Sequence, residues 1–144
     1  MKLSSRRLND VLIKALINGR GLVGGIVRGP IVTSRHAVSF LGGVDRFTGE
    51  IVDRKNNLHG ERIAGKILYI PTSVGSTVGA YIIYSICKNN LGPKAIVCEK
   101  ADLTLVTGCA IAGIPLVEGI SFNQLLDTAT YCILNGFEGT LYLQ

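Results

Sequence analysis

The sequence predicts an α/β domain whose centre is a small parallel sheet. In its second half, three short apolar strand patterns alternate with two helical patterns, and such alternation produces parallel strands joined by crossover helices. Further strand patterns at both ends predict extra strands beside that core. With 144 residues the chain is long enough to bury a core of its own. We therefore expect a single domain over 1–144, with 1–18 as a candidate N-terminal extension.

The parallel core is predicted from residues 66–117. The strand patterns cover Lys66–Ile70, Ala95–Cys98 and Ile114–Val117, and the helical patterns cover Thr77–Lys88 and 102–112. The first helical pattern is apolar on nearly every side, which predicts a deeply buried helix. Asp102 is a residue type that caps helix starts. Ser121 and Gln124 form a capping-box pattern that opens a further short helix.

The flanking segments predict strands and one short helix. Apolar residues at helical spacing favour an amphipathic helix over 8–16, with a strand over Val11–Ile17 as the alternative. Leu22–Val32 predicts two short strands or a kinked one. Tyr131–Leu134 and Thr140–Leu143 predict an antiparallel pair.

The composition disfavours two classes of partner. Lys and Arg outnumber Asp and Glu by 15 to 10, but the basic residues are scattered and aromatic residues make up only 6% of the chain, which argues against nucleic-acid binding. No apolar run reaches the roughly 18 to 20 residues of a membrane helix. No secretion leader follows the basic start, so we expect a cytoplasmic protein. The net charge of +5 suits a small phosphorylated or carboxylated substrate.

The four cysteines do not predict a metal site. Cys87, Cys98, Cys109 and Cys132 lie in apolar stretches, and none is spaced as C-x-x-C. Local spacing of that kind is what a chain uses to hold a metal or a cluster by itself. We expect small buried thiols and no metal bound by this chain alone.

The segment Pro71–Gly79 carries the strongest chemical signal. It joins a buried strand to a helix, and backbone N–H groups at such a helix start favour negative charge. Ser76 could present an acidified hydroxyl there, or Gly75 and Thr77 could help to bind a phosphate or carboxylate. The alternative is an ordinary helix cap formed by Ser76. Neither the P-loop nor the G-x-S-x-G pattern is present.

A second candidate segment lies within Ser34–Gly60, which has little periodicity and many turn signals. A loop of that length in a compact domain is usually functional or mobile. The paired Gly42 and Gly43 would let the backbone approach a ligand closely. Asp45 beside them could accept a hydrogen bond from a substrate hydroxyl, or it could simply belong to a solvated turn.

Three motifs together resemble the small subunit of the aconitase X family. They are Ser39-Phe40-x-Gly42-Gly43-Val44-Asp45-x-x-Thr48-Gly49, Leu58-x-Gly60-x-x-x-x-Gly65-Lys66 and Gly75-Ser76-Thr77. The first motif is specific, whereas the short glycine–serine element alone is not. The similarity runs from Gly19 or its near neighbours to the C-terminus.

The resemblance implies a swivelling β/β/α domain, as in the mobile fourth domain of aconitase. It also implies a large catalytic subunit of the aconitase X type that holds an iron–sulfur cluster, expected to be 4Fe-4S. In archaea such pairs are hydro-lyases that dehydrate (R)-mevalonate 5-phosphate to trans-anhydromevalonate 5-phosphate, in the mevalonate pathway to isoprenoids. A related bacterial branch dehydrates cis-3-hydroxy-L-proline. We expect a dehydratase subunit of the archaeal type that is active only with its large subunit.

The resemblance also assigns a role to Ser76, because the serine after the glycine is the family's base. In aconitase itself the serine pair is followed by an arginine that binds the substrate carboxylate, whereas Val78 stands at that position here. Citrate is therefore not the expected substrate. The alternatives are a cis-3-hydroxy-L-proline dehydratase subunit and a non-catalytic, anion-binding regulatory subunit. The expected substrate-binding residues are Gly42, Gly43, Asp45, Gly75 and Thr77.

Overall fold

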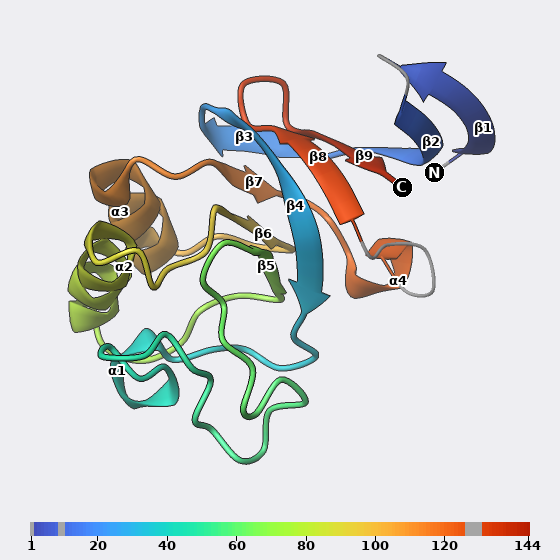
Figure 1. Cartoon of the computed structure of the whole chain (residues 1–144). Coiled ribbons are helices and arrows are strands. Elements are labelled where there is room, and N and C mark those ends of the chain that lie inside the picture. Colours follow the sequence, from blue (N-terminus) through green and yellow to red (C-terminus); the bar gives the residue numbers. More distant parts are fainter. Residues whose placement is uncertain (1, 9–10, 126–130) are drawn as a thin grey trace.

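The parallel centre of the fold consists of β4 (Ile26–Thr33), β5 (Ile67–Ile70), β6 (Ala95–Cys98) and β7 (Leu116–Glu118) (Figure 1). The other strands are β1 (Lys2–Leu8), β2 (Val11–Asn18), β3 (Arg20–Val23), β8 (Tyr131–Asn135) and β9 (Thr140–Leu143). The helices are α1 (Phe40–Gly43), α2 (Val78–Lys88), α3 (Leu103–Ala112) and α4 (Phe122–Leu125). This computed structural model describes residues 2–8, 11–125 and 131–144, which form one nine-stranded sheet in the order β1-β2-β9-β8-β4-β5-β6-β7-β3.

The parallel core confirms the central prediction. Every residue of β5 and β6 is buried, as expected for short apolar strands that are covered on both faces. The strand β6 spans Ala95–Cys98 as predicted, β5 begins one residue later than the pattern indicated, and β7 begins two residues later. The helices α2 and α3 connect these strands and lie side by side on the same face of the sheet (Figure 1).

Two apolar clusters place the parallel strands between two other layers. On one face, Leu68 of β5 belongs to a cluster with Ile83 of α2. On the other, Tyr69 of β5 belongs to a cluster with Leu134 of β8 and Leu141 of β9. Successive residues of β5 thus face opposite layers. The order of antiparallel strands, parallel strands and helices is the expected β/β/α arrangement.

The sheet curls because two consecutive strands, β2 and β3, pair near its opposite ends. The strand β2 pairs with β9 near one end of the strand order, and β3 pairs with β7 at the other. Gly19 alone separates β2 from β3, and its N–H donates to the Gly139 carbonyl oxygen at 2.7 Å. A Cβ at Gly21 would collide with the Gly136 carbonyl oxygen. Close backbone approach at these glycines lets the N-terminal strands cross the β8–β9 hairpin.

The predicted helix over 8–16 is wrong. Lys2–Leu8 and Val11–Asn18 are strands, so the alternative strand over Val11–Ile17 is confirmed. The strand β2 has backbone partners on both sides, in β1 and β9, and these ladders outweigh a weak helical spacing. The single-domain assignment and the boundary of the candidate extension at residue 18 stay predictions.

The prediction that the first helix is buried on nearly every side is also wrong. In α2, Ile82, Ile83 and Ile86 are buried, but Tyr81 is 62% exposed and Val78 is 48% exposed. The helix packs on the sheet and on α3, and its outer face meets solvent although it is apolar. None of the helices in the described residues has the length and apolar character that a membrane span requires.

The segment Ser34–Gly60 is packed rather than open. Phe40, Val44 and Ile51 are each at most 4% exposed and belong to the apolar cluster on the helical side of the sheet. An isolated antiparallel bridge joins Val44 to Ile51. Burial of its own apolar residues therefore orders this long connection and forms α1 within it.

Three smaller predictions are confirmed. Leu22–Val32 contains parts of two strands, β3 and β4, and β8 pairs antiparallel with β9. The Ser121 N–H donates to Gln124 Oε1 at 2.9 Å before α4, as a capping box requires. Asp102 caps α3, because its Oδ1 accepts from the Leu105 N–H at 3.0 Å.

We expect Gly21→Ala to destabilise the domain, because the added methyl group meets the Gly136 carbonyl oxygen and the backbone must move. The loss in free energy of unfolding should be about 1–3 kcal/mol, as at other overpacked sites. Gly29→Ala is the control, because it also lies in a strand but the nearest atom to its added Cβ is 3.4 Å away. Urea denaturation of both variants tests this, and equal losses would contradict it.

Candidate active site

Ser76 lies in the loop that joins β5 to α2, at the carboxyl edge of the parallel strands. Its Oγ accepts a hydrogen bond from the Val78 N–H, at 3.1 Å, at the start of the helix. That bond and the positive end of the helix would stabilise an alkoxide more than a hydroxyl. The N-cap residue of α2 is Thr77, whose side chain makes no capping bond, but Ser76 accepts from the first N–H of the helix as a capping serine would, so both interpretations of Ser76 fit this geometry. The residue is exposed to solvent.

The two predicted site segments lie against each other. The Val74 N–H donates to the Val38 carbonyl oxygen at 3.0 Å, so the backbone before Ser39 pairs with the serine loop. Gly75 has a φ of +98°, and a Cβ there would lie 2.9 Å from Ser39 Oγ. Both facts favour glycine at position 75, because other residues rarely adopt this conformation and would crowd Ser39.

The observed contacts of the predicted residues in α1 and in the turn after it shape the local backbone. Gly42 has a φ of +90° and open space where a Cβ would be, whereas Gly43 is buried and its N–H donates to the Ser39 carbonyl oxygen at 3.0 Å. Asp45 Oδ1 accepts from the Phe47 N–H at 2.7 Å, which stabilises a turn. Substrate binding by Gly42, Gly43 and Asp45 stays a prediction.

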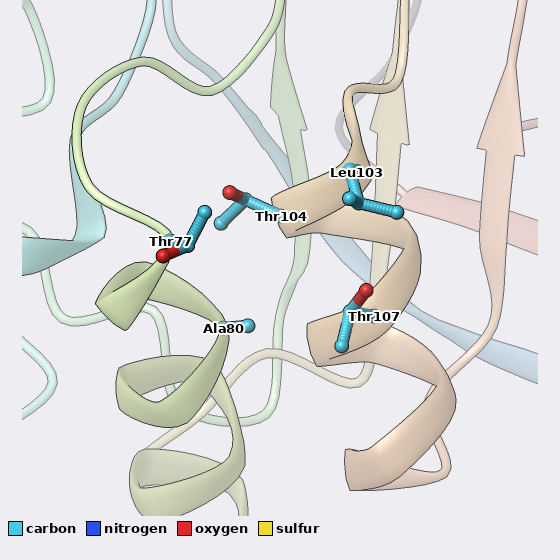
Figure 2. Close-up of a pocket in the computed structure, with 5 residues that line it drawn as sticks. All are labelled: Thr77, Ala80, Leu103, Thr104 and Thr107. Atoms are coloured by element: carbon cyan, nitrogen blue, oxygen red, sulfur yellow. The ribbon is translucent and has the colours of Figure 1, made fainter.

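A pocket of about 240 Å³ opens beside the serine loop, between the first turns of α2 and α3 (Figure 2). The side chains of Thr77 and Thr104 are turned toward each other across it.

Substrate binding by Gly75 and Thr77 stays a prediction. Sequence reasoning missed the α3 side of this pocket, because nothing in the spacing of those residues separates them from core positions. The pocket is lined by Thr77, Ala80, Leu103, Thr104 and Thr107.

A short, partly buried hydrogen bond links the serine loop to the start of α3. Ser73 Oγ donates to Asp102 Oδ1 at 2.6 Å. The sequence indicated Asp102 as a helix cap, and the structure adds this second partner. No sequence signal could have found it, because 29 positions separate the two residues and the contact depends on how β5 and β6 are aligned.

Three of the four cysteines are buried, as expected for small apolar thiols. Cys98, Cys109 and Cys132 are buried and Cys87 is partly so. Burial raises the pKa of Cys87 to about 11 and the pKa of Cys98 and of Cys132 to about 12, and it raises the pKa of Cys109 further. Among the described residues, no three His, Cys, Asp or Glu side chains are grouped so that they could hold a metal ion. These residues therefore do not fit an iron–sulfur cluster.

The carboxylate of Glu118, at the end of β7, is held in its ionised form. It accepts the Ala101 N–H at 3.0 Å and pairs with Arg20. The Ala101 hydrogen bond, followed by Arg20, lowers the pKa of Glu118 below the usual value for a glutamate. A carboxylate with these partners is a weak base, so Glu118 is not a candidate for removing a proton from carbon.

The β/β/α layers and the glycine–serine loop at the sheet edge define a swivel domain of the aconitase-like dehydratases. The family model described as the aconitase X swivel domain matches residues 16–143, and the chain belongs to that family.

Several relatives carry the name phosphomevalonate dehydratase small subunit. The one from Pyrococcus furiosus is 50% identical over 109 residues, which cover 76% of this chain and 81% of the relative. The one from Thermococcus gammatolerans is 45% identical over 123 residues, 85% of this chain and 93% of the relative. Among solved structures, the crystal structure of Thermococcus kodakaraensis aconitase X in its holo-form matches with a TM-score of 0.86 and 40% identity, over 90% of this chain and 98% of that one. The resemblance inferred from the sequence is confirmed.

We expect Gly75→Ala to destabilise the serine loop, because it combines a φ of +98° with a Cβ that crowds Ser39 Oγ. Gly60→Ala is the matched control, since Gly60 has a φ of +88° and no atom within 4 Å of its added Cβ. The loss in free energy of unfolding should be at least about 1 kcal/mol greater for Gly75→Ala. Urea denaturation of the chain measures both, and equal losses would show that the Ser39 contact has no cost.

Proposed function

We propose that this chain is the small subunit of a phosphomevalonate dehydratase, a hydro-lyase that converts (R)-mevalonate 5-phosphate to trans-anhydromevalonate 5-phosphate. Relatives of that name support the proposal, because they match most of the chain at 45–50% identity. Within the chain, the observation that carries it is the hydrogen bond between Ser76 Oγ and the Val78 N–H. We place the protein in the cytoplasm, in the archaeal mevalonate pathway, without nucleic-acid or membrane partners.

In the proposed reaction, a base removes a proton from the carbon next to the substrate carboxylate, and the hydroxyl on the neighbouring carbon departs. One C–H bond and one C–O bond break, a carbon–carbon double bond forms, and the net product of the departing groups is water. We assign the proton to Ser76 Oγ. The Val78 N–H would continue to donate to this oxygen while its charge changes, which is how a preorganised donor lowers a barrier.

Ser76 needs a covering partner in order to act as a base. It is exposed in this chain, and a hydroxyl in contact with bulk water is far too weak an acid to lose its proton at neutral pH. Excluding water would strengthen the bond from Val78 and the effect of any cation that the partner brings. A swivelling motion would open the cleft for substrate and close it for the reaction.

We assign this covering role to a large subunit of the aconitase X type. Leu41, Val74 and Val78 are between 48% and 51% exposed at and beside the serine loop, and an apolar rim of this kind suits contact with another protein. The large subunit would also hold the iron–sulfur cluster, expected to be 4Fe-4S, which supplies a Lewis acid for the leaving hydroxyl.

We expect Ser76→Ala to lower turnover sharply without disturbing assembly. In the complex with the large subunit, loss of a general base should lower turnover roughly 100-fold or more. Loss of a cap alone would cost about 1 kcal/mol of stability and little activity. Turnover, thermal stability and subunit binding of the variant separate these roles.

Ser121→Ala is the control for this experiment, because it removes a capping-box serine next to α4 rather than α2. Its turnover should stay near the wild-type value. If Ser76→Ala also retained near-normal turnover, Ser76 would be a cap, and a non-catalytic, anion-binding subunit would become the better description.

We expect the complex to dehydrate (R)-mevalonate 5-phosphate faster than cis-3-hydroxy-L-proline, because the relatives share the former activity in their name and the chain has a net charge of +5. Anaerobic assays of both substrates, with and without the large subunit, test this. The chain alone should give no turnover, and turnover without a partner would overturn the two-subunit model. Equal or faster dehydration of cis-3-hydroxy-L-proline would overturn the substrate assignment.

A further inference from the structure

We propose that Asp102 is a positioning residue for Ser76 and acts through Ser73. The inference rests on the proposed function, in which Ser76 receives the substrate proton. Neither Asp102 nor Ser73 touches substrate in this proposal. Together they determine where the loop that leads to Ser76 lies.

Ser73 and Asp102 form a short, partly buried hydrogen bond. Ser73 Oγ donates to Asp102 Oδ1 at 2.6 Å, and Ser73 is 5% exposed. A hydroxyl that donates to a carboxylate at this distance forms a charge-assisted bond, roughly twice as strong as a neutral one. Partial burial limits the competition from water, so the bond holds Ser73 in place relative to Asp102.

Asp102 is itself fixed to a helix. The same Oδ1 accepts the Leu105 N–H at 3.0 Å as the N-cap of α3. A backbone bond supports the link nearby, because the Glu99 N–H donates to the Pro71 carbonyl oxygen at 3.1 Å. The Pro71 carbonyl oxygen also accepts the Lys100 N–H at 3.2 Å. The segment after β5 is therefore tied to the segment after β6 at two residues, through the backbone of Pro71 and through the side chain of Ser73.

The opposite side of the loop is held by the segment after β4. The Val38 N–H donates to the Thr72 carbonyl oxygen at 3.1 Å, and the Val74 N–H donates to the Val38 carbonyl oxygen at 3.0 Å. Ser73 thus lies between two backbone bonds on one side and its own side-chain bond on the other. Two residues separate it from Ser76. Because this connection is so short, a displacement of Ser73 would also displace Ser76.

The two roles of Asp102 can be separated by substitution. Capping α3 requires a short side-chain acceptor, which serine supplies. Reaching Ser73 requires the longer arm of aspartate or asparagine. Asp102→Ser should keep the cap and lose the Ser73 bond, whereas Asp102→Asn keeps an oxygen that can accept both bonds. Ser73→Ala removes the bond from the other side and leaves the cap of α3 intact.

The test uses the complex of this chain with its large subunit, at a temperature at which every variant is folded. Ser73→Ala and Asp102→Ser should each lower kcat about 10-fold to 100-fold, as expected when a reacting group is misplaced by about an ångström. KM should change little, because neither residue binds substrate. Asp102→Asn should recover most of the lost kcat.

Ser34→Ala is the matched control for a merely structural effect. Ser34 is also a buried serine at the end of a neighbouring strand, and its Oγ donates to the His36 carbonyl oxygen and accepts from Asn56 Nδ2. This variant should lower thermal stability without a comparable loss of kcat. If Ser34→Ala lowered kcat as much as Ser73→Ala, then loss of any buried serine bond at this sheet edge would impair turnover. That result would overturn the proposal.

Combining Ser73→Ala with Ser76→Ala in one variant distinguishes this inference from the proposed function. If Asp102 and Ser73 act through Ser76, Ser73→Ala should not lower the residual kcat of Ser76→Ala any further, and an additional fall would overturn the proposal. If Ser76→Ala collapses turnover but Ser73→Ala and Asp102→Ser retain it, the positioning role fails and the function stands. If Ser76→Ala itself retains turnover, both fail.

Discussion

The parallel pairing of β5 with β4 and β6 is the constraint on which the candidate site depends. Parallel strands end at one edge, so the segments that follow them leave the sheet side by side. In those segments, Val38 forms backbone hydrogen bonds with the two neighbours of Ser73, and Ser73 donates to Asp102. A slip of one residue in β5 would turn Leu68 and Tyr69 to the wrong layers. The buried faces that specify the register therefore also specify the position of the serine loop.

Two serines three positions apart are placed in opposite environments. Ser73 is 5% exposed and bonded to a carboxylate, whereas Ser76 is exposed and bonded to a helix N–H. Between them, the positive φ of Gly75 turns the chain from the buried support toward the surface. In the proposed complex, a firmly held loop with a solvent-facing hydroxyl would suit a group that meets a substrate held largely by the partner subunit. It would not suit an enzyme that completes its reaction alone.

The sequence was a good guide where the signals are local. Apolar runs predicted β5 and β6, and Asp102 predicted the start of α3. It failed where neighbouring elements of the fold decide the outcome. The segment β2 is a strand because β1 and β9 pair with it. The helix α2 has an exposed outer face because no described element packs there. The site followed the same rule. The position of Gly75 and Ser76 between a strand and a helix followed from local patterns, whereas their roles stay predictions. The Ser39 contact and the Ser73–Asp102 bond depend on strand alignment, which no local pattern encodes.

The apolar excess of the chain can be understood from the same geometry. Hydrophobic residues make up 47% of the sequence, and some of them lie on the outer faces of α2 and α3, where Tyr81 is 62% exposed and Leu103 is 74% exposed. Leu103 also lines the pocket that begins at Thr77. In the proposed complex, burial of these faces would supply binding energy, and it would remove water beside Ser76 in the same step. Assembly and activation of the serine would then be one event, because the surface that holds the partner adjoins the loop that needs a dry environment.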